Sequence, residues 1–128
     1  MRIDRIDHVV LTVDDIERTI GFYVDVLGMT EVSFGSGRKA LAFGSSKINL
    51  HQRGRELEPK AANPTPGSAD LCLIADEPLE VVVADLAAHG VAIEEGPVSR
   101  TGARGSITSV YIRDPDRNLI ELSSYLHD

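Results

Sequence analysis

Cysteine is nearly absent from this sequence, in which Cys72 is the only one among 128 residues. A single cysteine can form neither an internal disulfide nor a cluster of thiolate metal ligands, and such sparing use is typical of a reducing compartment. The residues next to Cys72 are apolar, so we expect a buried structural thiol there rather than a reactive one.

Uninterrupted apolar runs are also missing. The opening MRIDRIDHVV carries charges at positions 2, 4, 5 and 7, so we expect neither a signal peptide nor a membrane anchor. The net charge of −7 repels polyanions, and no stripe of arginine and aromatic residues offsets that repulsion. These absences predict a cytoplasmic protein that binds neither membranes nor nucleic acid.

The sequence does contain enough apolar residues, 42%, to bury a core, so we expect residues 1–128 to form a single domain. In the first half, Asp14 and Glu17 form a capping box before an apolar helical stripe, and Gly28 ends the predicted helix. Alternating apolar residues predict strands on both sides of this helix. The expected strands are Ile6–Val13, Thr30–Phe34, Arg38–Phe43 and Ile48–Gln52.

A polar loop with three prolines, residues 53–67, precedes a second half with the same order of elements. Its predicted helix opens at Pro78, a favoured first-turn residue, and is capped by Gly90. The expected strands are Ala69–Ala75, Val91–Glu94, Ile107–Arg113 and Asn118–Tyr125. The chain is therefore predicted to have an α+β fold of two βαβββ modules, at about residues 4–52 and 68–126.

Residues with metal-ligand side chains occupy related positions in the two halves. A gap-free alignment puts His8 over Asp70, and the segment that ends in His51 overlies the segment that ends in Glu121. If each module curls into half a barrel, its first and last strands can aim these side chains at a common point. Nitrogen and carboxylate donors suit Fe, Mn, Ni or Zn better than Mg or Ca. For Asp70, capping of the turn before its strand is an equal alternative.

The segments IDHVVLTVDDIERTIGFYVDVLGM, INLHQ and VYIRDPDRNLIEL resemble the vicinal oxygen chelate superfamily, which includes glyoxalase I, extradiol dioxygenases, fosfomycin-resistance transferases and bleomycin-binding proteins. The resemblance covers nearly the whole chain and is greatest to small stand-alone glyoxalase-domain proteins. It implies that the two modules form paired half-barrels around a divalent metal, which binds adjacent substrate oxygens.

The resemblance also implies roles for individual residues. His8 matches the first-strand metal ligand, His51 the fourth-strand slot, Asp70 the fifth-strand slot and Glu121 the eighth-strand glutamate. In glyoxalase I the fourth-strand slot is usually a carboxylate and the fifth a histidine, so this chain reverses the two. Which residue acts as the base therefore stays open.

Other activities of the superfamily fit less well. Extradiol dioxygenases carry their second histidine in the slot held here by Asp70. Fosfomycin transferases have a tyrosine ten residues before the glutamate, matched by Tyr111, but Val10 replaces their hydroxyl residue. Bleomycin-binding relatives lack the metal ligands and bind in an apolar groove between subunits. Dioxygenase chemistry and metal-independent drug binding are kept as alternatives.

The resemblance favours a metal-dependent lyase or isomerase that acts on a small oxygenated substrate. Its catalytic candidates are Glu121, Asp70 and Tyr111, with one divalent transition metal per site and no other cofactor. Relatives of this length imply a homodimer whose metal sites take His8 and His51 from one subunit and Asp70 and Glu121 from the other.

Overall fold

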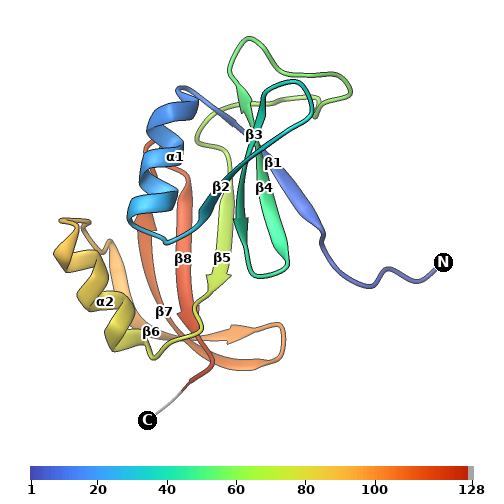
Figure 1. Cartoon of the computed structure of the whole chain (residues 1–128). Coiled ribbons are helices and arrows are strands. Elements are labelled where there is room, and N and C mark those ends of the chain that lie inside the picture. Colours follow the sequence, from blue (N-terminus) through green and yellow to red (C-terminus); the bar gives the residue numbers. More distant parts are fainter. Residues whose placement is uncertain (127–128) are drawn as a thin grey trace. The chain divides into compact units, whose positions relative to one another are not determined.

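The computed structural model describes residues 1–126 and divides the chain into two compact units, Met1–Gly67 and the part that starts at Ser68. Each unit has one helix and one four-stranded mixed sheet in the order βαβββ (Figure 1). The predicted α+β fold of two βαβββ modules is thereby confirmed.

The first unit is built on a sheet with the strand order β1-β4-β3-β2. Strand β1 pairs in parallel with β4, and the remaining neighbours pair antiparallel through tight turns. The elements are β1 (His8–Val13), α1 (Ile16–Asp25), β2 (Thr30–Phe34), β3 (Arg38–Phe43) and β4 (Ser46–Gln52).

Helix α1 begins one residue later than its capping box predicts. The cap is Asp15, whose carboxylate accepts a hydrogen bond from the Arg18 N–H at 3.0 Å. Asp14 pairs instead with Arg53 at 3.0 Å, so its carboxylate is directed away from the helix start. The helix ends at Asp25, and Gly28 after it has the left-handed conformation expected of its cap, with φ of +72°.

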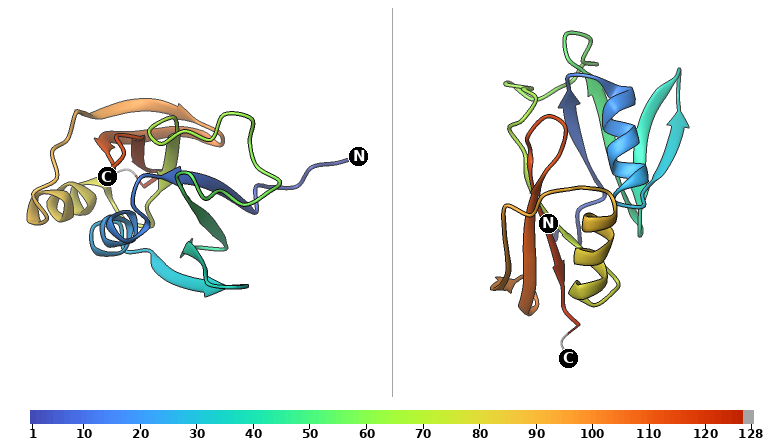
Figure 2. Two further views of the ribbon diagram at one scale, coloured as in Figure 1. Left: turned by 90° about the horizontal axis from the view of Figure 1, so that it is seen from above. Right: turned by 90° about the vertical axis from the view of Figure 1, so that its left-hand side faces the viewer.

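One face of this sheet is apolar and packs against α1. Leu11 and Val13 of β1, with Leu41, Ile48 and Leu50 of the neighbouring strands, are buried on it. Ile20 and Tyr23 of α1 are buried with them, and Figure 2 shows the helix lying along this side of the first sheet. Because strand residues alternate between faces, the opposite face receives His8, Asn49 and His51.

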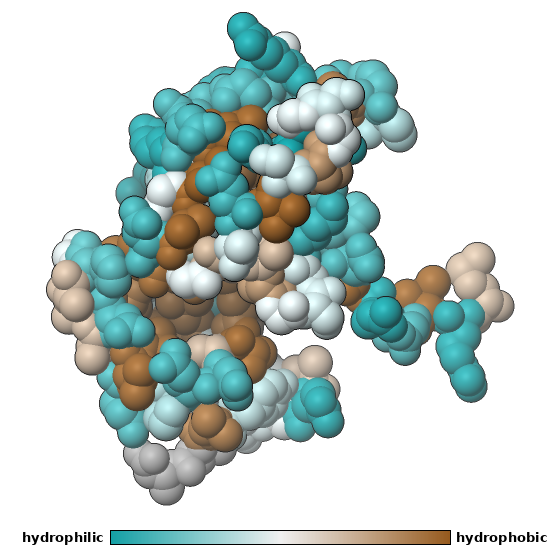
Figure 3. Space-filling model, in the orientation of Figure 1, coloured by the Kyte–Doolittle hydropathy of each residue, from teal (hydrophilic) through white to brown (hydrophobic). Residues whose placement is uncertain are grey.

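The first strand is shorter than predicted. It starts at His8 rather than Ile6, and Ile6 is 71% exposed. The pairing with β4 accounts for this start, because its register begins at His8 opposite Lys47. Residues 1–7 extend away from the sheet, with Met1 and Ile3 exposed as well (Figure 3).

The second unit repeats the arrangement with the strand order β5-β8-β7-β6. Strand β5 pairs in parallel with β8, and Leu79, Val82 and Leu86 are the buried residues of the helix. The elements are β5 (Asp70–Ile74), α2 (Leu79–Ala88), β6 (Glu95–Gly102), β7 (Gly105–Arg113) and β8 (Leu119–Ser124). Neither helix in residues 1–126 is long and apolar enough to cross a membrane.

The prediction of a strand at Val91–Glu94 is wrong, because β6 begins at Glu95. Val91 still belongs to the end of α2, because its N–H donates to the Leu86 carbonyl at 2.9 Å. The strand that does form, EGPVSRTG, holds residues that strands disfavour, and pairing with β7 overrides that propensity. At Gly96 the register shifts, φ is +108°, and a Cβ would collide with the Ser109 carbonyl oxygen.

A buried turn joins β7 to β8. The Asp114 carboxylate accepts hydrogen bonds from the backbone N–H groups of Asp116 and Asn118, both at 2.9 Å, and from the Asn118 side-chain amide at 2.8 Å. The side-chain Oδ1 atom of Asn118 in turn accepts from the Ala69 N–H at 2.8 Å, which fixes the start of β5. Arg117 adopts φ of +68°, a left-handed conformation that residues other than glycine rarely take.

We expect Asp114→Ala to lower the free energy of unfolding by about 2–4 kcal/mol, because it leaves buried N–H groups without their acceptor. Urea unfolding of both proteins measures the change. Asp14→Ala is the control, since its exposed pair with Arg53 is expected to contribute less than about 1 kcal/mol. Equal losses in the two variants would contradict the role given to the turn.

Candidate functional site

The four predicted metal ligands all lie in strands. His8 and Asp70 are the first residues of β1 and β5, so the predicted equivalence of these positions is confirmed. His51 lies in β4 and Glu121 in β8. The two histidines share one sheet face in the first unit, and the two carboxylates share one face in the second.

The alignment of His51 with Glu121 is wrong by two residues. In the second unit Glu121 pairs with Cys72, two residues after Asp70. The corresponding residue of the first unit is Asn49, which pairs with Val10, two residues after His8. His51 corresponds instead to Ser123. The turn before β4 is shorter than the turn before β8, and an overlay that treats both as equivalent tight turns does not allow for this.

Asn49 and His51 are neighbours on the same face of β4, and both are buried, with exposed fractions of 5% and 6%. The Oδ1 atom of Asn49 and the Nε2 atom of His51 have no hydrogen-bond partner among residues 1–126. A buried polar atom without a partner costs free energy, and a bound ligand or ion is one way in which such an atom gains a partner.

The electrostatic surroundings of His51 keep its ring neutral. Burial and the positive charge of Arg38 lower the pKa of His51, and the carboxylate of Glu56 opposes this effect. A neutral imidazole is the form that binds a metal, because its second nitrogen keeps a lone pair.

His8 is more exposed than His51, with 42% of its side chain accessible. Its Nδ1 atom lies 2.8 Å from a carboxylate oxygen of Asp7. A carboxylate on one ring nitrogen fixes the orientation of the imidazole and directs the other nitrogen outward, as in many histidine ligands.

In the second unit, Asp70, Tyr111 and Glu121 line an open pocket of about 500 Å³. Asp70 and Glu121 therefore line one pocket of the second unit. Glu121 is held by the Ser109 hydroxyl, which donates to its Oε2 atom at 2.7 Å, while Ser123 lies 3.4 Å from the same atom. These contacts fix the Glu121 side chain and with it the direction of its other carboxylate oxygen, Oε1. The remaining lining residues are Glu94, Glu95 and Leu119.

Arginines neutralise some carboxylates of this pocket but not others. Arg113 binds Glu94 through two nitrogens at 2.9 and 3.1 Å, and this hydrogen bonding lowers the pKa of Glu94. Arg100 binds Glu95 at 3.0 Å and also donates to the Tyr111 hydroxyl oxygen at 3.0 Å. Within the described part of the chain, no basic side chain forms an ion pair with Asp70 or Glu121.

Cys72 is exposed on the same face, so the expectation of a buried thiol is wrong. Its sulfur nevertheless lies against the sheet, 3.4 Å from the Ser123 hydroxyl. This local loss of water raises the pKa of the Cys72 thiol, and the charges of Glu121 and Asp70 raise it further, against the Ser123 hydrogen bond. The thiol is therefore a poor nucleophile at neutral pH.

Sequence reasoning missed Asn49, Ser109 and Ser123. For Asn49 a signal existed, because the alternation in INLHQ puts positions 49 and 51 on one face. No comparable signal pointed to the two serines, whose contact with Glu121 depends on the pairing of β7 with β8.

The donor types fit a divalent transition metal, since they combine imidazole nitrogen, amide oxygen and carboxylate oxygen. His8, Asn49 and His51 supply the first two types, and Asp70 and Glu121 supply the third. Among residues 1–126, neither unit by itself gathers three histidine, cysteine or acidic side chains into a metal cluster. Convergence of His8, His51, Asp70 and Glu121 on one ion stays a prediction.

Known proteins resemble this chain over nearly its full length. It is 61% identical over 126 residues to virulence protein STM3117 of Salmonella typhimurium, which covers 98% of this chain and 88% of that protein. The crystal structure of STM3117 superposes with a TM-score of 0.96 and covers 98% of this chain and 100% of that chain. Glyoxalase domain-containing protein RDO1 of Mycosarcoma maydis is 58% identical over 120 residues, 94% of this chain and 68% of the relative.

A lactoylglutathione lyase from Agrobacterium tumefaciens is more distant, at 25% identity and a TM-score of 0.74, with coverage of 98% of this chain and 96% of that chain. A family model matches residues 5–122. The description of this family model agrees with the superfamily that the sequence motifs resemble. The chain belongs to the Glyoxalase/Bleomycin resistance protein/Dioxygenase superfamily.

Proposed function

We propose that this protein is a divalent-metal-dependent lyase or isomerase of the glyoxalase type, acting on a small oxygenated substrate. The observation that carries the proposal is the pair of buried, unpartnered donor atoms, Asn49 Oδ1 and His51 Nε2, on the sheet face that also bears His8. Divalent metals are common in this superfamily, and the lactoylglutathione lyase supports the lyase class by its name.

The proposed metal ligands are His8, His51, Asp70 and Glu121, with Asn49 as a further oxygen donor. A divalent ion bound by them would act as a Lewis acid that stabilises negative charge on substrate oxygens. Metal binding would also relieve the cost of burying the His51 and Asn49 donor atoms, because each would gain a partner. The metal preference is for Fe, Mn, Ni or Zn.

Glu121, Asp70 and Tyr111 are the proposed catalytic residues. Ser109 holds one oxygen of Glu121 at 2.7 Å, so the carboxylate is oriented before a substrate arrives. Asp70 lines the same pocket, which places its carboxylate where it could accept a proton from a bound substrate. The Tyr111 hydroxyl accepts from Arg100 at 3.0 Å, which leaves its own hydrogen for donation to the substrate.

The chain is proposed to work as a single domain, residues 1–128, in a homodimer. Proteins with this fold bind small molecules and often form dimers. The first unit carries His8 and His51, and the second carries Asp70 and Glu121. A complete set of the proposed ligands therefore needs one first unit and one second unit. The pairing of a first unit with the second unit of a partner chain would provide it.

The first test of the proposed function is metal-dependent turnover. With 2-oxoaldehyde thiol adducts and hydroxy-keto acids as substrates, we expect an activity that chelation abolishes and that added metal restores. Full activity of metal-free protein would refute the proposal. Oxygen uptake on catechols would favour dioxygenase chemistry, and tight binding of hydrophobic drugs by metal-free protein would favour a binding module.

Single substitutions identify the ligands in the first unit. We expect His51→Gln and Asn49→Leu each to weaken metal binding by at least tenfold in calorimetric titration, since each removes a donor atom. His89→Gln is the control, because His89 lies at the end of α2 and its ring binds the Asp85 carbonyl. Loss of affinity in only one of the two variants would show which residue of β4 is the ligand.

Stability should depend on pH through His51. Because the pKa of His51 is lowered from 6.5 in the folded protein, the stability gained from its neutral form is fully present above this value. It is lost as the pH falls through the folded pKa. In urea unfolding without metal, wild-type protein should lose more stability than His51→Gln between about pH 7.5 and about pH 5. Equal losses would show that His51 is not held neutral.

Subunit mixing tests the shared site. One inactive variant carries His8→Ala and His51→Ala, and the other carries Glu121→Ala. After subunit exchange, we expect about one intact site per heterodimer, because the unaltered halves meet. A monomer at micromolar concentration in sedimentation, or no recovered metal binding in verified heterodimers, would contradict this arrangement.

A further inference from the structure

Two cations of the first unit lie against the same aromatic ring. The guanidinium carbon of Arg38 is 4.7 Å from the centroid of the Phe34 ring, and the Lys47 ammonium is 3.8 Å from it. Phe34 and Arg38 are paired residues of β2 and β3, whereas Lys47 comes from β4. Three strands therefore converge at this point, and cation–π attraction holds both charges in place.

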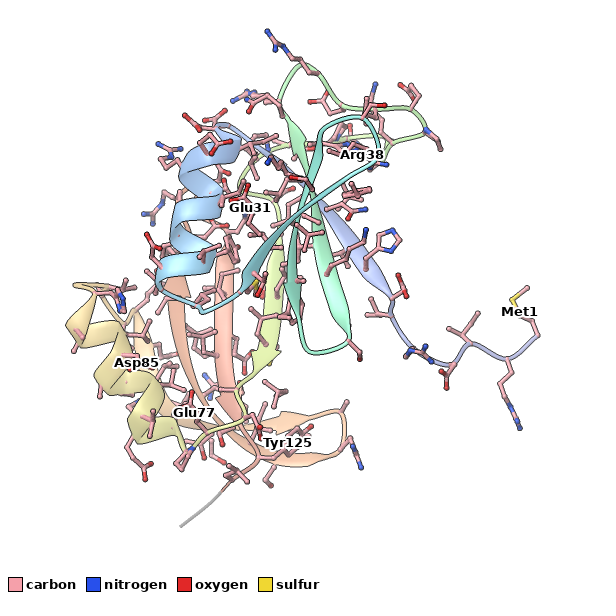
Figure 4. All side chains as sticks on the ribbon, in the orientation of Figure 1. Met1, Glu31, Arg38, Glu77, Asp85 and Tyr125 are labelled. Atoms are coloured by element: carbon pink, nitrogen blue, oxygen red, sulfur yellow. The ribbon has the colours of Figure 1, made fainter. Side chains whose placement is uncertain are left out.

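This cluster, formed by Phe34, Arg38 and Lys47, lies on the sheet face that bears Asn49 and His51. Lys39 pairs with Leu50 in the register of β3 and β4, so Arg38 comes opposite His51 at the next position. In Figure 4 Arg38 lies on the side of the sheet away from α1, and Glu31 lies on the side of α1.

Neither cation of this cluster has a carboxylate partner in residues 1–126. Acidic residues nevertheless outnumber basic ones by 20 to 13 in this chain. The carboxylate of Asp7 is near enough to feel the charge of Lys47, but it binds His8. Other basic residues form ion pairs, namely Arg5 with Asp4, Lys39 with Glu31, Arg53 with Asp14, Lys60 with Glu58, Arg100 with Glu95 and Arg113 with Glu94.

We propose that Arg38, which lies beside His51, and Lys47, held with it on Phe34, form a subsite for an anionic oxygen group, a carboxylate or a phosphate, of the small molecule that this protein binds. Two like charges held on one ring repel each other, and a bound anion lowers that repulsion. Arginine and lysine both bind such groups through charge-assisted hydrogen bonds. The subsite therefore selects an anionic substrate in a protein whose overall charge repels anions.

The identity of the bound molecule as a substrate rests on the proposed function, but anion binding itself needs no metal. Calorimetric titration of metal-free protein at low ionic strength tests it with three probes: glycolate, glycolamide and inorganic phosphate. We expect glycolate or phosphate to bind and neutral glycolamide not to bind. The stronger of the two anions identifies the group as a carboxylate or a phosphate.

Charge-removing variants locate the binding. Arg38→Gln and Lys47→Met should each weaken anion binding by about tenfold, because each removes a charged donor. Lys39→Met is the matched control, since Lys39 lies on the opposite face and pairs with Glu31 and Ser33 at 2.9 Å. It should leave binding unchanged, and near-native circular dichroism of all three variants excludes unfolding.

Several results would overturn the subsite: equal binding of glycolamide, no binding of either anion, or an equal loss in Lys39→Met. Failure of the proposed function is a different result. Anion binding that depends on Arg38 and Lys47, in a protein without metal-dependent turnover, would support the subsite and refute the lyase or isomerase. Metal-dependent turnover of neutral and anionic substrates alike, unaffected by Arg38→Gln and Lys47→Met, would support the lyase or isomerase and refute the subsite.

Discussion

The parallel pairing of the first strand with the last strand is the constraint on which each unit depends. It puts Val10 beside Asn49 in one unit and Cys72 beside Glu121 in the other. Because side chains alternate along a strand, this register decides which residues face the helix and which face the open side of the sheet. A shift of one residue would exchange the apolar core of each unit for its polar face.

The open faces of the two units have opposite chemistry although their backbones follow the same plan. The first carries imidazole and amide groups together with the cations Arg38 and Lys47. The second carries the carboxylates Asp70 and Glu121 in a pocket where Glu94 and Glu95 are already paired with arginines. The same fold therefore presents imidazole and amide groups on one unit and carboxylate oxygens on the other.

The order of elements was predictable because each signal is local. Apolar periodicity located both helices, and Gly28 and Gly90 end them with positive φ. Errors arose where long-range pairing decides. Strand β6 contains Gly96 and Pro97 and exists because β7 offers it a partner. The start of β1 is set by pairing with β4 rather than by its own alternation, which continues back to Ile6.

The candidate site was predictable in type but not in register. The polar residues of the strands made His8, Asp70 and Glu121 candidates, whereas the overlay of the last strands chose His51 where the strand pairing selects Asn49. Asn49 and His51 face the same side of the sheet, and each buries a polar atom that has no hydrogen-bond partner among residues 1–126. The free-energy cost of burying these two atoms therefore falls at one place on the sheet. A bound group offsets this cost when it supplies the missing hydrogen bond or coordination. The imidazole, the amide and the two nearby cations on this face suit a group that is rich in oxygen and negatively charged.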